Sequence, residues 1–296
     1  MLATLVATPF NKPGWIYEEK YDGVRLLAYK EGDRVRLLSR NDIDNTARFP
    51  AVAAAIEKLP AASLLLDGEV VVFDKKDVSR FQLLQRSEGH AAYAVFDCLY
   101  ANGEDLRRKP LSQRRERLER ILAGSKVLLL SRRLATNGLE AYKIAKRRGY
   151  EGVLAKDNSS PYVEKRSNFW LKVKVRQEDE FIIAGFTPPA GARKYFGALL
   201  LGGYEKGRLV YVGKVGTGFT GDTLAMLHRK FAALIRKPPT FDDPPRERNA
   251  AFLEPKLVAQ ISYQEWTGDR KLRQAAFLGL REDKHPKDVL VPESAK

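Results

Sequence analysis

The sequence predicts an α+β protein of two domains: a mixed, mostly antiparallel α/β domain followed by a small all-β barrel. The chain has 296 residues, and single hydrophobic cores stop growing at roughly 250–300 residues. Strand-like and helix-like segments alternate up to residue 176, whereas short strands with glycine-rich turns dominate afterwards. We therefore place the two domains at residues 1–176 and 177–296.

The first domain contains both strand and helix patterns. Apolar or alternating runs predict strands at 14–17, 24–29, 34–38, 64–73, 92–99 and 127–130. Apolar residues at helical spacing predict helices at 50–59, 111–122 and 137–148. In the helix at 111–122 we expect the leucines and Ile121 to face inward and the arginines to form a solvated face.

The second domain differs from the first in its predicted secondary structure. Its predicted elements are a helix at 221–234 and strands at 181–186, 198–204, 208–215 and 254–266. About five strands with one helix are typical of a small Greek-key barrel such as the OB-fold. The polar segment Gln177–Glu180 predicts a hinge between the domains.

Charge and composition restrict the class of protein. The formal net charge is +15 and the sequence pI is about 9.8, which favours a polyanionic partner such as nucleic acid. Charge alone also fits a merely soluble basic protein. The single cysteine excludes an intramolecular disulfide and a multi-cysteine zinc site. The apolar runs fall short of a membrane span and no secretory signal is visible, so we expect a cytoplasmic protein.

Lys20 stands between a strand and a glycine-containing turn, in the segment EEKYDGVR at residues 18–25. Read alone, this segment is equally well a solvated charged turn. It is followed in order by SRN at 39–41, LDGEVV at 66–71, YAVFD at 93–97, EGVLAK at 151–156, WLKVK at 170–174 and REDK at 281–284. Together these segments supply the cations, carboxylates and aromatic side chain that nucleotidyl transfer needs.

The ordered set resembles the covalent nucleotidyltransferase superfamily of ATP-dependent polynucleotide ligases and mRNA capping enzymes. More narrowly, it resembles the ligase domain of bacterial end-joining ligases of the D type, over about residues 5–291. The resemblance implies an ATP-grasp-like nucleotidyltransferase domain followed by an OB-fold domain. It also implies an ATP-dependent DNA ligase that seals 5′-phosphate and 3′-hydroxyl ends through lysine-adenylate and DNA-adenylate intermediates, in repair by end joining.

Lys20 is the candidate nucleophile, which would attack the α-phosphorus of ATP. A lysine amine has an ordinary pKa of about 10.4 and must lose its proton first. Desolvation and nearby cations lower such a pKa, and Lys172 and Lys174 share one strand face because they are two residues apart. The alternative is that these two lysines lie on an exposed edge strand and prevent it from pairing with another chain.

Glu69 and Glu151 are the candidate metal ligands, because Mg²⁺ (or Mn²⁺) is bound by one or two carboxylates together with phosphate and water. The resemblance implies that Glu69 also contacts the ribose and that Glu151 is the better metal candidate. Solvated turn carboxylates are the alternative.

The remaining site residues follow from the resemblance. It implies that Phe96 stacks on adenine, although a core phenylalanine is the alternative, and that Glu18 lies at the adenine edge. Arg25 and Arg40 would contact ribose or phosphates, with Arg40 the clamp for the DNA 5′-phosphate. The segment with Arg281 and Lys284 would orient the leaving pyrophosphate, or else be an exposed charged turn.

Two other functions stay open at this point. One is an RNA ligase or a capping-type nucleotidyltransferase, and the other is a catalytically silent nucleic-acid-binding module. The carboxylates argue against the silent module, since plain binding needs only cations and aromatic side chains. As partners we expect nicked or broken double-stranded DNA and, from the resemblance, Ku and polymerase or nuclease modules. We expect a monomer that is associated with the nucleoid when it is on DNA.

Overall fold

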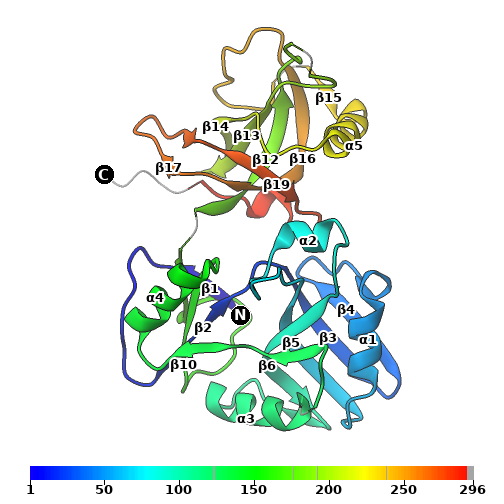
Figure 1. The fold of residues 1–296 in the computed structure, drawn as a ribbon, viewed down its shortest axis with the longest axis vertical. Coiled ribbons are helices and arrows are strands. Elements are labelled where there is room, and N and C mark those ends of the chain that lie inside the picture. The colour runs from blue at the N-terminus through cyan, green and yellow to red at the C-terminus, as the bar shows by residue number, and fades with distance from the viewer. Residues whose placement is uncertain (123, 176, 192, 238, 292–296) are drawn as a thin grey trace. The chain divides into compact units, whose positions relative to one another are not determined.

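The structure, a computed structural model, describes residues 1–291 except residues 123, 176, 192 and 238. It divides into two compact units, Met1–Arg176 and Gln177–Lys296 (Figure 1). Arg176, the last residue of the predicted first domain, lies outside the described residues. Among the helices of the described part, none is long and apolar enough to cross a membrane.

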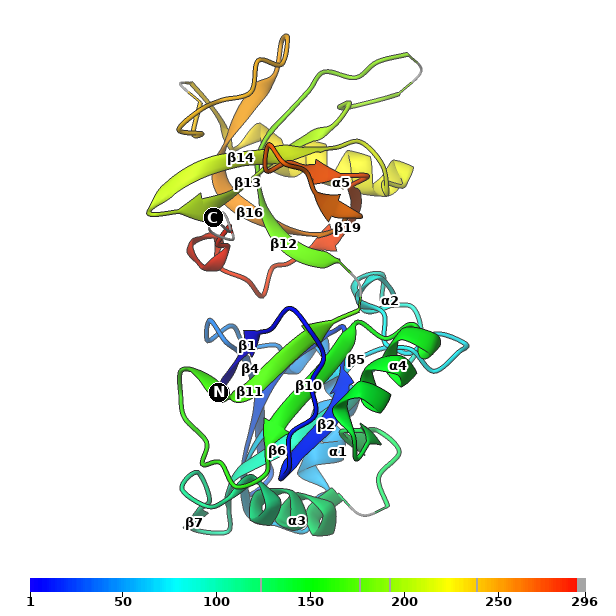
Figure 2. The ribbon, with the colours of Figure 1, turned by 90° about the vertical axis from the view of Figure 1, so that its left-hand side faces the viewer.

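The first unit contains a sheet with the strand order β1-β11-β10-β2-β9, and Figure 2 shows β1, β11, β10 and β2 side by side. Its strands are β1 (Leu2–Leu5), β11 (Arg166–Lys174), β10 (Gly152–Asp157), β2 (Trp15–Lys20) and β9 (Arg133–Ala135). β1 joins β11 in parallel and the other pairs are antiparallel. We refer to it as the first sheet.

Helix α4 (Gly138–Arg148) packs against one face of the first sheet. The side chain of Asn137 accepts the N–H groups of Leu139 and Glu140, which starts the helix, and Gly149 ends it in the left-handed region at φ 73°. Small alanines face inward from the helix and pack with buried residues of the strands, namely Tyr17, Val153 and Ala155. The opposite face of the sheet is therefore left for polar side chains.

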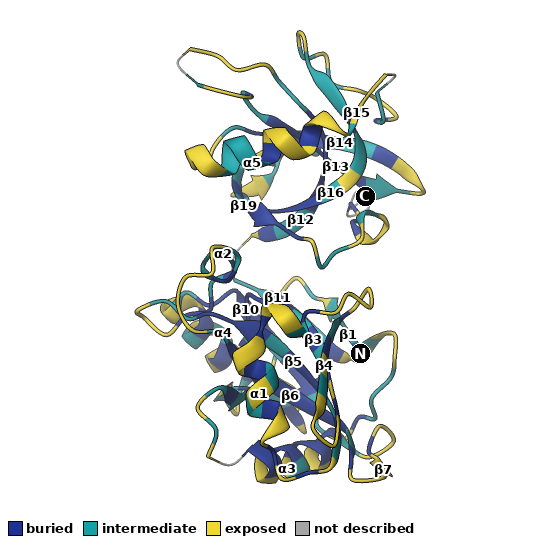
Figure 3. Ribbon diagram, turned by 90° about the vertical axis from the view of Figure 1, so that its right-hand side faces the viewer, coloured by how far each residue is buried: buried dark blue, intermediate teal, exposed yellow. Residues whose placement is uncertain are grey.

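The second sheet of the first unit has the order β4-β3-β5-β6-β7, with β8 parallel to β6. Its strands are β4 (Arg34–Ser39), β3 (Val24–Glu31), β5 (Ser63–Val71), β6 (Ala92–Ala101), β7 (Glu104–Asp105) and β8 (Leu128–Leu130). The accompanying helices are η1 (Thr46–Arg48), α1 (Pro50–Glu57), α2 (Phe81–Gln85) and α3 (Leu111–Leu122). Along β3, buried apolar residues alternate with Arg25, which faces away from this core. Figure 3 shows buried and exposed residues alternating along α1 and α3.

The second unit holds a sheet with the order β14-β13-β12-β16-β15, with β19 added to β16, and a short β17-β18 pair. Its strands are β12 (Glu178–Phe186), β13 (Leu199–Glu205), β14 (Arg208–Val215), β15 (Ile235–Arg236), β16 (Ala251–Ser262), β17 (Glu265–Trp266), β18 (Leu272–Arg273) and β19 (Ala276–Leu280). Helix α5 (Gly221–Ala232) packs Leu227 and Phe231 into the core, and η2 (Pro286–Asp288) follows β19. The predicted fold class, a mixed and mostly antiparallel domain followed by an OB-fold domain, is confirmed.

Each predicted helix and strand overlaps one in the structure, but two other expectations were incomplete or wrong. Strands β1, β9 and β10 were not predicted; β1 and β9 are short, and all three pair with segments distant in sequence. The expected hinge at Gln177–Glu180 was wrong in its extent, since the boundary between the units falls before Gln177 but β12 already begins at Glu178, which is buried and pairs with Ser262. Cross-strand pairing thus orders a segment whose composition is that of a linker.

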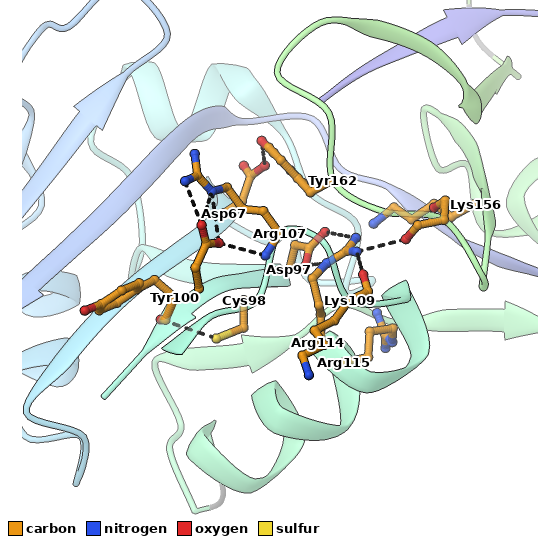
Figure 4. A network of polar contacts seen from close by, with 12 residues as sticks. Asp67, Asp97, Cys98, Tyr100, Arg107, Lys109, Arg114, Arg115, Lys156 and Tyr162 are labelled. Atoms are coloured by element: carbon orange, nitrogen blue, oxygen red, sulfur yellow. Dashed lines mark hydrogen bonds and ion pairs between the residues drawn. The ribbon is translucent and has the colours of Figure 1, made fainter. Parts of the chain in front are cut away.

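The arginines of α3 do not all lie on a solvated face, so that expectation was wrong. Arg114 and Arg115 are 0% and 1% exposed. Arg114 donates to both carboxylate oxygens of Asp97 at 2.7 and 2.9 Å (Figure 4). It also donates to the carbonyl oxygens of Lys109 and Ser160 at 2.6 and 2.9 Å. A buried ion pair therefore fixes α3 against β6.

We expect Arg114→Met to destabilise the first unit by about 3–5 kcal/mol, because it leaves the Asp97 carboxylate buried without its ion-pair partner. Native-state hydrogen exchange of the β6 amides measures this loss. The double substitution Asp97→Leu/Arg114→Met removes both charges and should recover much of it. The control is Arg120→Met, which breaks an exposed pair with Glu116 on the same helix. Equal losses in Arg114→Met and Arg120→Met would contradict the prediction.

Candidate active site

Three strands of the first sheet align the predicted reactive side chains. Lys20 on β2 and Lys174 on β11 both pair with Gly152 of β10, so the three residues form one row across the sheet. Glu18 and Lys172 occupy the next row, on opposite sides of β10. Because residues two apart on a strand share a face, these four side chains lie on the face that α4 does not cover.

Gly152 is required at the centre of the row. A Cβ atom there would lie 2.2 Å from the carbonyl oxygen of Val173, too close for any side chain. β11 lies between β1 and β10, so the explanation of Lys172 and Lys174 as protection of an edge strand was wrong.

The amine of Lys20 contacts the carboxylate of Glu151, the residue immediately before β10. The two side chains are only 18% and 6% exposed. Burial lowers the pKa of Lys20, but the charges of Glu151, Glu69 and Asp22 outweigh burial and raise the pKa above its ordinary value. The expectation of a lowered pKa was therefore wrong for this arrangement, which holds Lys20 as an ammonium ion.

Arg25 and Phe96 lie where the two sheets of the first unit approach each other. Arg25 donates to both oxygens of Asp67 at 2.9 and 2.6 Å, and the Tyr162 hydroxyl donates to the same carboxylate at 2.8 Å. Burial alone would raise the pKa of Asp67, but Arg25 holds it below its ordinary value. The Arg25 guanidinium lies 5.3 Å from the ring centre of Phe96, which packs edge-on against Trp170 at 5.7 Å.

Glu18 is a buried carboxylate with two cationic partners. It accepts hydrogen bonds from Arg115 and, at 2.6 Å, from Lys156. The Lys156 amine also lies 4.4 Å from the ring centre of Phe96 and 4.2 Å from that of Trp170. Both carboxylate oxygens of Glu18 therefore accept hydrogen bonds from basic side chains.

Glu69 completes a pair of carboxylates near Lys20. It lies on β5, directly across from Arg25 on β3, and its charge acts on Lys20. Within the described residues, no three His, Cys, Asp or Glu side chains gather closely enough to hold a metal ion together. Glu69 and Glu151 supply two carboxylates, and a hard cation such as Mg²⁺ is bound by one or two carboxylates together with water and phosphate oxygens.

Three other predicted site residues are carried by other parts of the chain. Arg40 is exposed just beyond β4. Arg281 and Lys284 belong to the second unit. There Arg281 is 7% exposed and donates twice to Asp283 at 2.8 Å, and the Lys284 amine lies 3.3 Å from Glu180.

Sequence reasoning assigned no role to Lys156, Arg115 or Tyr162. Lys156 lies four residues after Gly152, so the period of two already placed it on the reactive face. Arg115 is four residues after Leu111, on the apolar side of α3. Tyr162 lies in an irregular segment, where no pattern in the sequence indicates its contact with Asp67.

Comparisons with known proteins identify the family of the chain. Residues 1–174 match the family described as "ATP dependent DNA ligase domain", and residues 192–284 match "ATP dependent DNA ligase C terminal region". The multifunctional non-homologous end joining protein LigD of Pseudomonas aeruginosa is 40% identical over 97% of this chain and 36% of that protein. LigD of Mycobacterium tuberculosis H37Rv is 36% identical, over 98% of this chain and 40% of that protein. The chain thus spans less than half the length of these two relatives.

A solved structure extends the similarity to the whole chain. The structure of mycobacterial DNA ligase D complexed with ATP and MES is 34% identical, covers 98% of both chains and superposes with a TM-score of 0.71. The first family alone covers more than half of the chain, and the second unit matches its C-terminal region. The chain therefore belongs to the ATP-dependent DNA ligases.

Proposed function

We propose that this chain joins 5′-phosphate and 3′-hydroxyl ends of nicked or broken double-stranded DNA at the expense of ATP. The observation that carries the proposal is the row of Lys20, Gly152 and Lys174, with Glu151 at the nucleophile. The Lys20 nitrogen forms a bond to the α-phosphorus as the bond to the pyrophosphate oxygen breaks. Lys172 and Lys174 neutralise the charge that develops on the α-phosphate. The adenylate then passes to the DNA 5′-phosphate, and the 3′-hydroxyl displaces AMP.

Glu151 controls the protonation state of the nucleophile. It contributes most among the charges that raise the pKa of Lys20, so its withdrawal leaves burial opposed only by the charges of Glu69 and Asp22, and the pKa falls. A divalent cation bound by Glu151 and Glu69 would supply positive charge beside the triphosphate. Glu151 thus has two uses, first as a partner of the ammonium ion and then as a metal ligand.

The buried carboxylate of Glu18 supports the choice of adenine. A carboxylate oxygen accepts a hydrogen bond from the 6-amino group of adenine, whereas guanine presents a carbonyl oxygen at that position. We assign adenine stacking to Phe96 and ribose contacts to Arg25 and Glu69. Arg40, exposed beyond β4, is assigned to the DNA 5′-phosphate, and Arg281 with Lys284 to the leaving pyrophosphate.

The relatives support a place in end joining. Both LigD proteins are named for non-homologous end joining, so we propose this role here, with Ku and polymerase or nuclease modules as partners. We further propose a monomer that works in the cytoplasm, on the DNA of the nucleoid. An RNA ligase or capping-type enzyme is the second candidate function, favoured only by the shared superfamily motifs.

The decisive experiment incubates the protein with α-labelled ATP, GTP or NAD and a divalent metal, followed by nicked DNA or nicked RNA. We expect labelling by ATP alone, through a bond that is stable in base and labile in acid, and sealing of the DNA nick. Lys20→Ala should abolish labelling, whereas the control Lys12→Ala, an exposed lysine near β2, should retain it. Labelling by GTP, or retained labelling of Lys20→Ala, would sink the assignment.

Glu151→Gln should separate the two uses of this carboxylate. We expect adenylation to slow on the order of 10²–10³-fold, because a metal ligand is lost. At the same time the pKa of Lys20 should fall, because its nearest negative charge is gone. The pH dependence of Lys20 acylation, followed by peptide mass spectrometry, measures the second effect. Glu140→Gln, an exposed glutamate of α4, is the matched control, and an unchanged Lys20 titration would refute the account.

Lys284→Ala should lose self-adenylation yet still seal a nick that already carries a 5′-adenylate, because pyrophosphate leaves only in the first step. Lys284 is a better probe than Arg281, whose buried contacts with Asp283 make its removal damaging to the fold. The control is Lys287→Ala, an exposed lysine three residues later. Normal adenylation by Lys284→Ala would contradict the assignment to the pyrophosphate and would indicate that residues 281–284 form only a charged turn.

A further inference from the structure

A pocket of about 460 Å³ in the first unit gathers four arginines. Arg132 immediately precedes β9 and Arg133 is the first residue of that strand. Arg147 and Arg148 come from the last turn of α4. Among the described residues that line the pocket, Asp77 is the one carboxylate. The sequence alone places the α4 arginines in a run that resembles any solvated helix end, and only the fold brings the two pairs together.

Most of this positive charge is not neutralised within the protein. Arg132 pairs with Glu19 at 3.2 Å and with Asp77 at 2.6 Å. The exposed side chains of the other three arginines make no hydrogen bond or ion pair with the described residues. The end of a helix favours cations, which accounts for the two on α4. It does not account for Arg133, which arrives from a separate strand.

The pocket is connected by hydrogen bonds to residues adjacent in sequence to Lys20 and Glu151. The N–H of Glu19, the neighbour of Lys20, donates to the carbonyl oxygen of Arg132 at 3.0 Å. Arg132 also donates to the hydroxyl of Tyr150, the neighbour of Glu151, at 2.7 Å. Because adjacent residues of a strand face opposite sides, Lys20 and the pocket lie on opposite faces of the same edge of the sheet.

We propose that this arginine pocket binds the phosphate backbone of DNA, outside the nucleotide site. Guanidinium groups match phosphate oxygens two at a time. A DNA duplex is too wide to enter a closed cavity. Three of the four arginines are exposed, so the phosphates on the surface of a duplex can reach them. The inference rests on DNA as the substrate in the proposed function. A free polyphosphate offers the same chemistry and is separated from DNA by the experiment.

The test compares two double variants of the full chain with equal loss of charge on the same helix. One is Arg147→Gln/Arg148→Gln, and the control is Lys143→Gln/Lys146→Gln, whose lysines do not line the pocket. We expect the arginine variant to bind a nicked duplex roughly tenfold more weakly. The slope of log K against log salt should also fall by about 1–2, since each lost phosphate contact removes roughly one unit. The control should change about twofold or less.

Additional measurements separate a loss of DNA binding from other effects of the substitutions. Self-adenylation by ATP should be unchanged in both double variants, and Arg147→Lys/Arg148→Lys should retain most of the binding. Equal loss in the arginine and lysine variants, or no loss in either, would overturn the proposal. The proposal would also be overturned if Arg147→Gln/Arg148→Gln lost binding of tripolyphosphate but bound nicked DNA normally. Failure of the unmodified protein to adenylate or bind DNA would instead refute the proposed function.

Discussion

The position of β10 between β2 and β11 is the constraint on which the site depends. Lys20 and Lys174 are far apart in the chain, and they meet only because both strands pair with Gly152. A slip of one residue in either register would turn the corresponding lysine toward α4 and the apolar cluster behind the sheet. The packing of α4 on one face thus specifies which side chains stand on the other.

Buried charges then fix the surroundings of this row. Asp67 is held by Arg25 and Tyr162, Asp97 by Arg114, and Glu18 by two cations. Each of these carboxylates has its partners within the first unit, which offsets the cost of burial. The partners come from different strands and from α3, so the ion pairs connect the elements that border the site. Side chains restrained in this way lose little further freedom when a ligand binds.

Much of this arrangement could be predicted from the sequence, and the exceptions share a cause. Helices such as α4 and strands such as β3 have local patterns, and the ordered motifs identified Lys20, Glu151 and the lysines of β11. The buried arginines of α3 were misjudged because a run of charges looks solvated until its partners, such as Asp97, are known. The direction of the Lys20 pKa shift was also wrong, because it depends on a carboxylate more than a hundred residues away. Each error concerns a contact between segments that are distant in sequence.

Gly152 has a consequence for redesign of this protein. Glu18 and Phe96, to which we assign the recognition of adenine, act through their side chains, whereas Gly152 is needed for the close approach of the backbone. At Gly152 the nearby carbonyl oxygen leaves no space for even a methyl group. Libraries that seek a different nucleotide preference can therefore vary the side chains that we assign to adenine, but they have to keep Gly152 unchanged.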